Sequence, residues 1–451
     1  MDTQSFFIKT FGCQMNVRDS EIVAQLLTQQ GYRPAPEISE ANLIVLNTCA
    51  IRAKAEQKMF SFLGSLRTHK EKHPDVKICV LGCVAQQLGD TITKRMAHVD
   101  LVVGTQQLYQ LPSLLEDPRN RVAVELLEDF AIPEIVSPET EPDHPSTQPP
   151  SASRFVTIMQ GCNNFCAYCV VPYTRGREQS RAKEDIIDEI EQHVARGVKE
   201  ITLLGQNVNS YGSTNPVTAD GSPYSFAHLV RDVAKIPGLR RIRFTTSHPK
   251  DLSPELIQCF AELPTLCPHL HLPVQSGSNR ILTLMNRRYR REAYLALVET
   301  LKIARPDIAI TTDIIVGFPG ETETDFADTM ALLESARFHG SFSFKYSDRA
   351  GTSAQSMPDK VEETIKAERL RTFQHRQEKI SLEHNQKYID HIVEVMVESS
   401  RQDSLMGRTG TNHIVHIAPT DTQFSPGELV NLRITHAGPH ALRGAVAPAH
   451  S

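Results

Sequence analysis

The sequence predicts an α/β protein in three parts: a doubly wound parallel sheet, a partial barrel of six βα units and a small β-barrel. Predicted strands alternate with helical patterns through residues 4–120 and again through 151–380. Short strands separated by Gly and Pro fill residues 381–448. An acidic, proline-rich segment, residues 121–150, lies between the first two parts, and we interpret it as an extended linker.

In the first part, helical patterns separate the predicted strands. The resulting βαβαβ order requires crossover connections, which join parallel strands and place helices on the faces of the sheet. The predicted strands read "FFIKTF", "ANLIVLNT", "VKICVLG" and "VDLVVGT", and the helical patterns between them read "VRDSEIVAQLLTQQG", "AKAEQKMFSFLGSLRTHKE" and "GDTITKRMAHV".

The central part continues this alternation with six predicted strands. Six βα units are too many for a comfortable open sheet and fewer than the eight of a closed barrel, so we expect a partial, open barrel. In such folds, ligands bind at the carboxyl ends of the strands. The predicted strands read "FVTIMQ", "EITLLG", "RIRFTTS", "HLHLPV", "ITTDIIVG" and "GSFSFKYS".

A charged helical pattern, "DKVEETIKAERLRTFQHRQEKI", ends the central part near Ile380. The alternating stretches "HIVEVMVES", "NHIVHIA" and "ELVNLRIT" follow it and predict a small β-barrel. Residues 360–451 hold eleven basic and eleven acidic groups, so charge alone does not mark this region as a nucleic-acid surface.

Composition limits the class of protein. The chain has 451 residues and a net charge of −5, but residues 116–145 alone carry −7, which leaves +2 for the rest and allows a nucleic-acid partner. There is no apolar run of about 18 residues to predict a membrane span, and the first residues lack a secretory signal pattern. We therefore expect a cytoplasmic protein. Nine cysteines in such a chain favour thiolate chemistry over disulfides.

Three cysteines follow the first strand of the central part in the pattern C-x-x-x-C-x-x-C. Cys162, Cys166 and Cys169 form this barrel triad, which the strand end places at the mouth of the predicted barrel. A structural zinc ion is one alternative, but it would need a fourth Cys or His ligand, and the next cysteine is Cys259. Three thiolates on a [4Fe–4S] cluster would leave one iron open to an outside ligand.

A second set of cysteines lies in the first part. Cys13, Cys49 and Cys83, the N-terminal triad, each lie one or two residues beyond a predicted strand. Because the carboxyl ends of parallel strands share one edge of a sheet, the three thiols can converge there and hold a second open cluster. The alternative is three unrelated cysteines buried as small hydrophobic residues. The remaining cysteines, Cys79, Cys259 and Cys267, are interpreted as packing residues.

The cysteine loop at the start of a partial βα barrel resembles that of the radical S-adenosylmethionine enzymes. The resemblance implies that S-adenosylmethionine binds the open iron and is cleaved by one electron to a 5′-deoxyadenosyl radical. It also implies cofactor contacts from residues whose alternative is ordinary loop and packing chemistry, namely Tyr168, Gly205 and Gln206 of "LLGQNVNSYG", Ser247 of "TTSHP", and Ile315 and Gly317 of "DIIVGFPGE".

Two open clusters in one chain resemble the methylthiotransferases, and this resemblance covers nearly the whole sequence. Within that family the chain is most similar to the bacterial enzymes that make 2-methylthio-N6-isopentenyladenosine in tRNA. The C-terminal β module resembles a TRAM domain, which binds RNA in this family. The similarity lies in "FGCQMNVRDSE", "NTCAIRAKAEQK", "CVVPYTRGREQSR", "HLPVQSGSNRILTLMNRRY" and "IIVGFPGET".

The resemblance implies a reaction that uses two molecules of S-adenosylmethionine. One donates a methyl group to sulfur held at the N-terminal triad, and the other supplies the radical at the barrel triad. The radical takes hydrogen from carbon 2 of a prenylated adenosine at tRNA position 37, in the anticodon stem-loop, before the methylthio group is transferred. A loop base can be splayed out for such chemistry more cheaply than a paired base.

Arginines after the fourth barrel strand are candidates for RNA contacts. "NRRYRREAY" supplies Arg287, Arg288, Arg290 and Arg291, which either bind phosphates or form a solvated helix face. Arg52, after Cys49, either approaches the substrate or pairs with a neighbouring Glu.

The family resemblance further implies an electron donor such as flavodoxin or ferredoxin, and a monomer that needs no membrane. No side chain is predicted to act as a general base. Two rival functions are considered. One is a methylthiotransferase acting on a ribosomal-protein aspartate or on threonylcarbamoyladenosine, and the other is a non-catalytic iron–sulfur protein that binds RNA.

Overall fold

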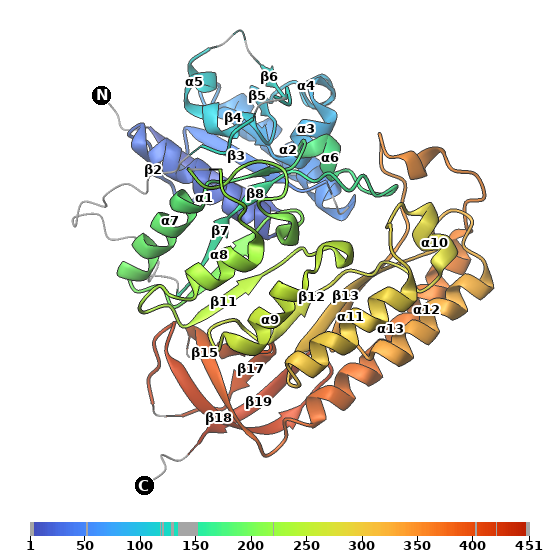
Figure 1. Cartoon of the computed structure of the whole chain (residues 1–451). Helices are drawn as coiled ribbons and strands as arrows, with labels where there is room; N and C mark the ends of the chain where they lie inside the picture. The colour runs from blue at the N-terminus through green and yellow to red at the C-terminus, as the bar shows by residue number, and fades with distance from the viewer. Residues whose placement is uncertain are drawn as a thin grey trace.

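The computed structural model describes residues 4–50, 53–117, 119, 121–127, 130–133, 152–219, 221–401, 404–420 and 422–447. An N-terminal α/β unit and a C-terminal β-barrel lie at opposite ends of a central α/β unit (Figure 1). Most of the predicted linker, residues 134–150, and Arg52 lie outside the described residues.

The N-terminal unit contains one sheet with the strand order β2-β1-β3-β4-β5-β6, in which every neighbouring pair is parallel. The predicted doubly wound parallel sheet is confirmed. Its strands are β1 (Ser5–Phe11), β2 (Arg33–Pro34), β3 (Leu43–Thr48), β4 (Lys77–Leu81), β5 (Leu101–Val103) and β6 (Val122–Ala123), and its helices are α1 (Gln14–Gln29), α2 (Ala53–Lys72), α3 (Cys83–Leu88), α4 (Asp90–Arg95) and α5 (Leu111–Glu116).

Helices cover both faces of this sheet. Side chains alternate along a strand, so Ile44 of β3 packs with Leu63 of α2, while Val45 packs on the other face with Val23 of α1. Every residue of β3 is buried, as expected for a central strand of a parallel sheet.

Two helices near the cysteines differ from the sequence prediction. α1 begins at Gln14, directly after Cys13, rather than at Val17. The pattern predicted as one helix over residues 89–99 is preceded by α3, which starts at Cys83. Gly89, with a φ of +48°, separates α3 from α4. The predicted helix therefore corresponds to α4, and α3, which ends before the positive φ of Gly89, was not predicted.

The central unit has six parallel strands in two groups of three, with the orders β11-β10-β7 and β12-β13-β14. A parallel bridge between Ile242 and Leu266 lies where the two groups meet. Because β7 and β14 each have one unpaired edge, the barrel is open, and the predicted partial barrel is confirmed. The strands are β7 (Ser153–Thr157), β10 (Glu200–Leu204), β11 (Arg241–Phe244), β12 (His269–His271), β13 (Ala309–Val316) and β14 (Gly340–Lys345).

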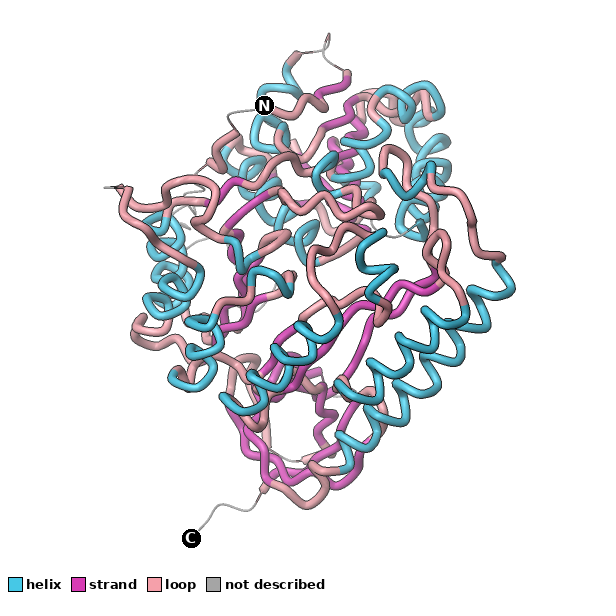
Figure 2. The backbone as a smooth tube through the Cα atoms, turned by 45° about the vertical axis from the view of Figure 1, so that its right-hand side comes forward, coloured by secondary structure: helices cyan, strands magenta, loops and turns pink. Residues whose placement is uncertain are grey.

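Helices lie outside the six strands (Figures 1 and 2). A short antiparallel pair, β8 and β9, precedes the first long helix of the unit. The bounds are β8 (Met159–Gln160), β9 (Gln179–Ser180), α6 (Val171–Thr174), α7 (Lys183–Ala195), α8 (Phe226–Val233), α9 (Pro254–Glu262), α10 (Asn279–Leu284), α11 (Arg291–Ala304), α12 (Glu323–Ala336) and α13 (Glu363–Gln386).

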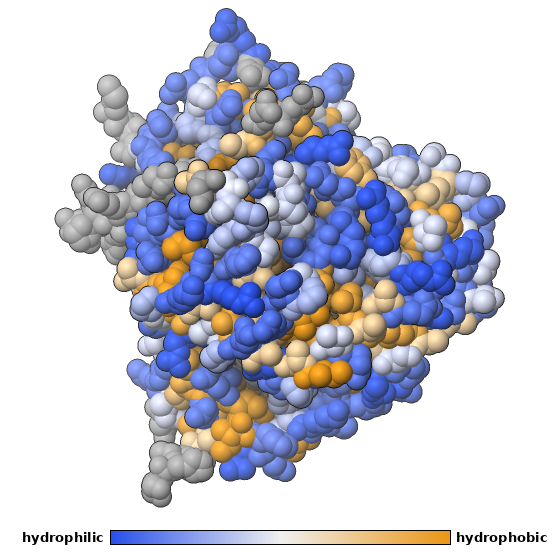
Figure 3. Space-filling model, in the orientation of Figure 1, coloured by the Kyte–Doolittle hydropathy of each residue, from blue (hydrophilic) through white to orange (hydrophobic). Residues whose placement is uncertain are grey.

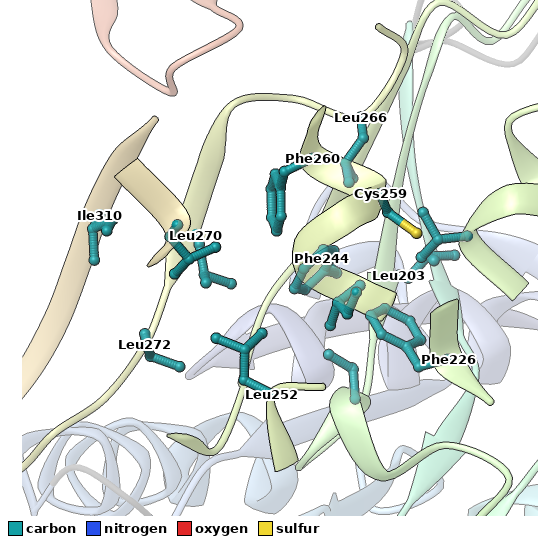
Figure 4. Close-up of a cluster of buried hydrophobic side chains, with 14 of the residues drawn as sticks. Leu203, Phe226, Phe244, Leu252, Cys259, Phe260, Leu266, Leu270, Leu272 and Ile310 are labelled. Atoms are coloured by element: carbon teal, nitrogen blue, oxygen red, sulfur yellow. The ribbon is translucent and has the colours of Figure 1, made fainter. Parts of the chain in front are cut away.

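The main core lies between these strands and helices. Figure 4 shows Phe244 of β11 beside Phe226 of α8 and Phe260 of α9, and the rings of Phe226 and Phe244 meet edge to face at 5.0 Å. Cys259 is part of this cluster and is fully buried, while Cys79 lies in the N-terminal core. These placements confirm the packing interpretation for both cysteines.

The C-terminal unit is a closed five-stranded barrel in the order β15-β16-β17-β19-β18, as predicted. α13 passes through residue 380, the predicted boundary, and ends at Gln386, because Ile380 is buried in the central core. The barrel strands are β15 (Ile392–Arg401), β16 (Ser404–Thr409), β17 (Ile414–Ile417), β18 (Leu429–Ala437) and β19 (Ala441–Val446).

Two buried arginines, Arg241 and Arg243, join the C-terminal barrel to β11. Arg241 donates to the carbonyl oxygen of Arg408 at 2.8 Å. Arg243 pairs with Glu200 at 2.9 Å and donates to the carbonyl oxygen of Thr409 at 2.7 Å. These bonds fix the backbone of the C-terminal barrel to the side chains of β11.

Hydrophilic and hydrophobic residues are intermixed on the face drawn in Figure 3. Within the described parts of the chain, no helix has both the length and the apolar character needed to cross a bilayer.

We expect Arg243→Ala to destabilise the junction between the central unit and the C-terminal barrel by about 3–5 kcal/mol, because Glu200 would remain buried without its partner. Urea unfolding combined with limited proteolysis of the barrel would measure this loss. Arg433→Ala is the control, since Arg433 is exposed and donates only to the carbonyl oxygen of Asp390. Equal losses in the two variants would contradict the assignment.

Stability should also fall as the pH drops from about 7 to 4. The ring of His339 in the central unit stacks on that of His384, with 3.9 Å between the ring centroids. The ring centroid of His413 in the C-terminal barrel lies 6.3 Å from that of His339. Burial lowers the pKa of His339 to about 2 and that of His413 to about 4. The unfolded chain, with histidine pKa values near 6.5, therefore binds more protons in this window, and acid favours unfolding.

Urea unfolding at several pH values would measure this slope. His413→Gln should flatten it, whereas the exposed His440→Gln should not. An unchanged slope in His413→Gln would show that another group controls acid stability.

Candidate functional site

The N-terminal triad lies at the carboxyl edge of the first sheet. Cys13 follows β1, Cys49 follows β3 and Cys83 begins α3 just after β4. These three strands are neighbours in the sheet, so residues far apart in sequence reach one edge.

Contacts among these thiols show that they gather at one place. The side chains of Cys13 and Cys49 are hydrogen-bonded, and this bond is the main cause that lowers the pKa of Cys13 to about 6. Burial raises the pKa of Cys83, and the nearby Cys13 raises it further. The thiolate is the form that binds metals, so a metal centre would relieve the cost of ionising thiols that lie this close together.

The backbone around the triad leaves little space. A Cβ atom on Gly12 would lie 2.6 Å from Cβ of Cys49, and one on Gly82 would collide with the side chain of Asn47. Gly82 also has a φ of +97°, which favours glycine. Asn16 donates to the side-chain oxygen of Asn47 at 2.8 Å and ties two of the cysteine-bearing loops together. Sequence reasoning missed both asparagines, although they stand close to Cys13 and Cys49.

The barrel triad occupies the loop between β8 and α6. Phe165 within this loop has a φ of +46°, and the Cys169 amide donates to the carbonyl oxygen of Cys166 at 2.9 Å. Burial, together with the nearby Cys166, raises the pKa of Cys162 to about 11 and that of Cys169 to about 12. The loop therefore holds Cys162 and Cys166 buried, with Cys169 partly exposed beside them.

One sulfur of each triad accepts a hydrogen bond from an arginine. Arg175 Nε lies 3.3 Å from Cys83 Sγ, and Arg287 Nη1 lies 3.4 Å from Cys166 Sγ. Both arginines are buried. A guanidinium is permanently charged and favours thiolate over thiol, so these contacts suit metal-bound sulfur. The donor set therefore fits an iron–sulfur cluster in each triad better than neutral packing cysteines.

The contact made by Arg287 corrects its predicted role. This side chain is only 4% exposed and donates to the carbonyl oxygen of Pro273 at 2.6 Å. A buried guanidinium with these partners does not face an RNA phosphate, so the phosphate contact expected of Arg287 is withdrawn. The neighbouring arginines in the sequence are exposed, so the sequence pattern predicted an exposed side chain for Arg287 as well.

The other predicted RNA-binding arginines lie at or near the surface. Arg288 and Arg290 are exposed. Arg291 begins α11, is half-buried and pairs with Asp328 at 2.9 Å. Arg290 also pairs with Glu292 at 3.4 Å, so Arg290 and Arg291 would each have to release a carboxylate to bind a phosphate, whereas Arg288 would not.

The two triads lie on opposite sides of the interface between the N-terminal and central units. Arg175 belongs to the central unit, yet it contacts Cys83 of the N-terminal triad. The hydroxyl of Thr105 donates to the carbonyl oxygen of Thr174 at 2.5 Å, and Val170, adjacent to Cys169, packs within the N-terminal core. The interface therefore brings together the loops that carry both triads.

Helix α1 supplies two buried ion pairs to this interface. Asp19 pairs with Arg175 at 2.5 Å, and Arg18 pairs with Glu189 of α7 at 2.5 Å. Burial alone would raise the pKa of Glu189, but a bond from His193 and the charges of Arg18 and Arg181 lower it to about 2. Sequence reasoning assigned these residues no role.

Three of the predicted cofactor residues follow neighbouring barrel strands. Gln206, after β10, accepts a hydrogen bond from the Gly161 amide at 2.6 Å, next to Cys162. Gly205 has no room for a Cβ atom, which would collide with Met159. Ser247, beyond β11, is buried, and its hydroxyl has no partner among the described residues. An unsatisfied buried hydroxyl suits a ligand from outside the protein.

The other three predicted cofactor residues lie on the opposite side of the barrel mouth. Ile315 of β13 and Tyr168 belong to one small hydrophobic cluster with Phe318. Gly317 follows β13 with a φ of +71°. The Tyr168 hydroxyl lies 3.5 Å from Arg287. Contacts from all six residues to S-adenosylmethionine remain predictions.

Neither cysteine triad encloses a single metal-ion position in the described part of the chain. In the part of the chain that the structure describes, no three His, Cys, Asp or Glu side chains enclose a single metal-ion position. A structural zinc ion needs four protein ligands arranged tetrahedrally around it.

Comparison with known families agrees with the two sites. Residues 5–104 match the model of "Uncharacterized protein family UPF0004", and residues 156–333 match that of the radical SAM superfamily. Each match contains one triad. The fold and the barrel triad therefore define a radical S-adenosylmethionine enzyme with an additional cysteine site in its N-terminal unit.

Curated relatives identify the family. A protein of Desulfotalea psychrophila is 55% identical over 449 residues, which cover 99% of each chain. A protein of Geobacter metallireducens is 49% identical over 98% of each chain. Both are named tRNA-2-methylthio-N(6)-dimethylallyladenosine synthase. This chain belongs to that family of tRNA methylthiotransferases.

Solved structures support the fold. The radical S-adenosylmethionine methyltransferase TsrM of Kitasatospora setae, with cobalamin and a [4Fe–4S] cluster bound, matches with a TM-score of 0.59 at 13% identity, over 79% of this chain and 77% of that one. The cobalamin-dependent enzyme OxsB, with aqua-cobalamin and S-adenosylmethionine bound, matches with a TM-score of 0.51 at 12% identity, over 84% and 56%.

We expect Gly161→Ala to disrupt the barrel triad, because Gly161 has a φ of +83° and an added Cβ would collide with the carbonyl oxygen of Arg177. Gly197→Ala is a matched control, since Gly197 has a φ of +93° but nothing within 4 Å of the added atom. Both changes carry the backbone cost of about 1–3 kcal/mol. Urea unfolding should show a larger loss for Gly161→Ala, and equal losses would contradict the tight fit.

Proposed function

We propose that this chain transfers a methylthio group to carbon 2 of N6-isopentenyladenosine at tRNA position 37, using two molecules of S-adenosylmethionine. Relatives up to 55% identical over nearly the full length support this reaction. The structural observation that carries the proposal is that one cysteine triad lies on each side of one interface, with Arg175 of the central unit in contact with Cys83 of the N-terminal triad. Sulfur insertion needs a sulfur source and a radical source close together.

In this proposal, the N-terminal triad and the barrel triad each hold a [4Fe–4S] cluster through three thiolates. The clusters supply electron transfer and a place for sulfur, and S-adenosylmethionine supplies the methyl group and the radical. The protein holds the sulfurs, excludes water by burying both loops, and sets the separation of the two sites. Removal of hydrogen by a radical needs no general base, which agrees with the absence of a predicted one.

The barrel mouth is the proposed site of S-adenosylmethionine. Ser247 offers a buried, unpartnered hydroxyl, and Gln206 lies next to the loop of Cys162. Tyr168, Gly205, Ile315 and Gly317 would complete the contacts. Residues from several strand ends would thus hold one ligand, as is usual for barrels of this kind.

The RNA side of the proposal rests on exposed arginines and on the C-terminal barrel. Arg288 and Arg290 are the phosphate contacts retained from the sequence analysis, although Arg290, like Arg291, would contribute only if it released a carboxylate. We assign residues 4–120 to the methylthiotransferase domain, 121–150 to a linker, 151–380 to the radical domain and 381–448 to a TRAM-like RNA-binding domain.

We further propose that the enzyme is a cytoplasmic monomer that receives electrons from a flavodoxin or ferredoxin. Cleavage of S-adenosylmethionine by a [4Fe–4S] cluster needs a strong one-electron reductant, and these small proteins belong to that class.

Two clusters per chain predict about eight irons and eight sulfides in anaerobically prepared protein. Cys13→Ala should lower the iron content to about four by removing the ligation of one cluster. Cys259→Ala is the control, because this cysteine is buried in the central core and should keep all the iron. An unchanged iron content in Cys13→Ala would contradict a cluster in the N-terminal triad.

Substitutions in the two triads should have different effects on the two steps of the reaction. Cys49→Ala should still cleave S-adenosylmethionine to 5′-deoxyadenosine but should not insert sulfur, whereas Cys166→Ala should lose both activities. Chromatography of 5′-deoxyadenosine and mass spectrometry of tRNA nucleosides would measure the two steps. Loss of cleavage in Cys49→Ala, with the barrel cluster still loaded, would contradict this division of roles.

The same assays distinguish the rival functions, which the family match does not favour. Methylthio groups on a ribosomal-protein aspartate or on threonylcarbamoyladenosine, with prenylated adenosine unchanged, would replace the proposed substrate. Intact RNA binding with no cleavage of S-adenosylmethionine by the reduced protein would indicate a non-catalytic iron–sulfur protein.

A further inference from the structure

The two buried arginines that donate to the triads differ in how their charges are balanced. Arg287 donates to Cys166 Sγ at 3.4 Å, and Arg175 donates to Cys83 Sγ at 3.3 Å. Their exposed fractions are 4% and 2%. Each therefore acts on its sulfur with little screening by water.

Arg287 has neutral partners apart from the cysteine. Its guanidinium donates to the carbonyl oxygen of Pro273 at 2.6 Å and to the Tyr289 hydroxyl at 2.9 Å. In the described part of the chain, the side chains that act most strongly on it are those of Tyr168, Tyr289 and Cys166, none of which is a carboxylate. His248 packs on Tyr289, and burial together with the charge of Arg287 lowers the pKa of His248 to about 2, so this ring is neutral as well. The positive charge of Arg287 is thus left for the barrel triad.

Arg175, in contrast, forms a complete ion pair. Its two terminal nitrogens donate to the two carboxylate oxygens of Asp19 at 3.2 and 2.5 Å, and Asp19 is itself 3% exposed at the side chain. The pair has no net charge. The N-terminal triad therefore receives a hydrogen bond from Arg175 but little net positive potential.

This difference matters for redox chemistry. Reduction adds one negative charge to an iron–sulfur cluster, and the reduction potential depends on net charge and on hydrogen bonds to the sulfurs. A nearby uncompensated cation stabilises the reduced form, whereas a neutral ion pair at the same distance stabilises it much less. Groups outside the ligand shell tune metal sites in this way.

We propose that Arg287 and the Arg175–Asp19 pair are positioning groups that set the electron affinities of the two clusters separately. Arg287 raises the reduction potential of the cluster on the barrel triad, where S-adenosylmethionine must be cleaved. Asp19 restrains the effect of Arg175 on the cluster of the N-terminal triad. This inference rests on the proposed function, because it requires a cluster in each triad.

Redox titrations monitored by electron paramagnetic resonance on full-length protein test the inference. One background carries Ala at all three N-terminal cysteines, so that the signal comes from the barrel cluster alone, and the other carries Ala at all three barrel cysteines. Dithionite supplies the electrons, and iron content is measured for every sample. The iron content shows whether each triad holds a cluster, which tests the proposed function. The reduction potentials test the further inference separately.

In the first background, Arg287→Gln should lower the equilibrium constant for reduction of the barrel cluster at least tenfold. For a one-electron couple, this is a fall in reduction potential of about 59 mV. Arg287→Lys retains the charge and should shift the potential less. Arg288→Gln is the matched control, because the adjacent Arg288 is exposed and screened by water, and it should leave the potential unchanged.

In the second background, Asp19→Asn should favour reduction of the N-terminal cluster by about tenfold, since Arg175 then becomes uncompensated. Adding Arg175→Gln to Asp19→Asn should return the potential close to its original value.

An unchanged potential in Arg287→Gln, or a fall on Asp19→Asn, would overturn the inference. If Arg287→Gln fails to hold iron, Arg287→Lys provides the test. A tenfold fall in its equilibrium constant for reduction, despite the retained charge, would also overturn the inference. Absence of iron from an unsubstituted triad would instead contradict the proposed function.

Discussion

The buried ion pair between Arg175 and Asp19 holds together the two units that carry the cysteines. Isolated charges are costly to bury, so neither residue is stable in its position unless the two units are closed against each other. Arg18, next to Asp19 on α1, forms a second buried ion pair across the interface with Glu189 of α7, and this pair has the same requirement. Since Arg175 also donates to Cys83, closure of the interface and completion of the N-terminal site are one event. The geometry of sulfur transfer depends on this contact between domains.

Parallel strand topology explains why the cysteines meet there. Cys13, Cys49, Cys83 and Cys162 lie one or two residues beyond the end of a strand, and Cys166 and Cys169 follow in the loop of Cys162. The sheet order places the ends of β1, β3 and β4 side by side. The C-terminal barrel is attached to β11 through Arg241, the first residue of this strand, and Arg243. The module expected to bind RNA therefore lies away from the cysteines (Figure 1). An RNA bound by both regions would have to extend along the central unit.

Elements with a strong local pattern were predictable. The parallel sheets, the open barrel and the closed C-terminal barrel were predicted from hydrophobic runs and their order. A strand buried on both faces is a continuous hydrophobic run, and a strand buried on one face alternates hydrophobic and polar residues. The start of α1 at Gln14 and the short helix α3 before Gly89 were missed, since helix ends depend on backbone geometry more than on periodicity. The inward orientation of Arg287 was missed for a related reason: a run of arginines reads as solvent-exposed, and only a positive φ on each side of Arg287 turns its side chain towards Cys166.

The sequence by itself determined the fold class, the family and the presence of two cysteine triads at strand ends, because spacing and hydrophobic order are local properties of the chain. The tertiary structure decided which charges face those sulfurs. Asp19 and Arg175 are far apart in the chain, as are Cys166 and Arg287, and no local pattern records such a pairing. Whether a buried charge is balanced by a carboxylate or left for a metal site depends on which elements pack against each other, and that is a property of the folded interface alone.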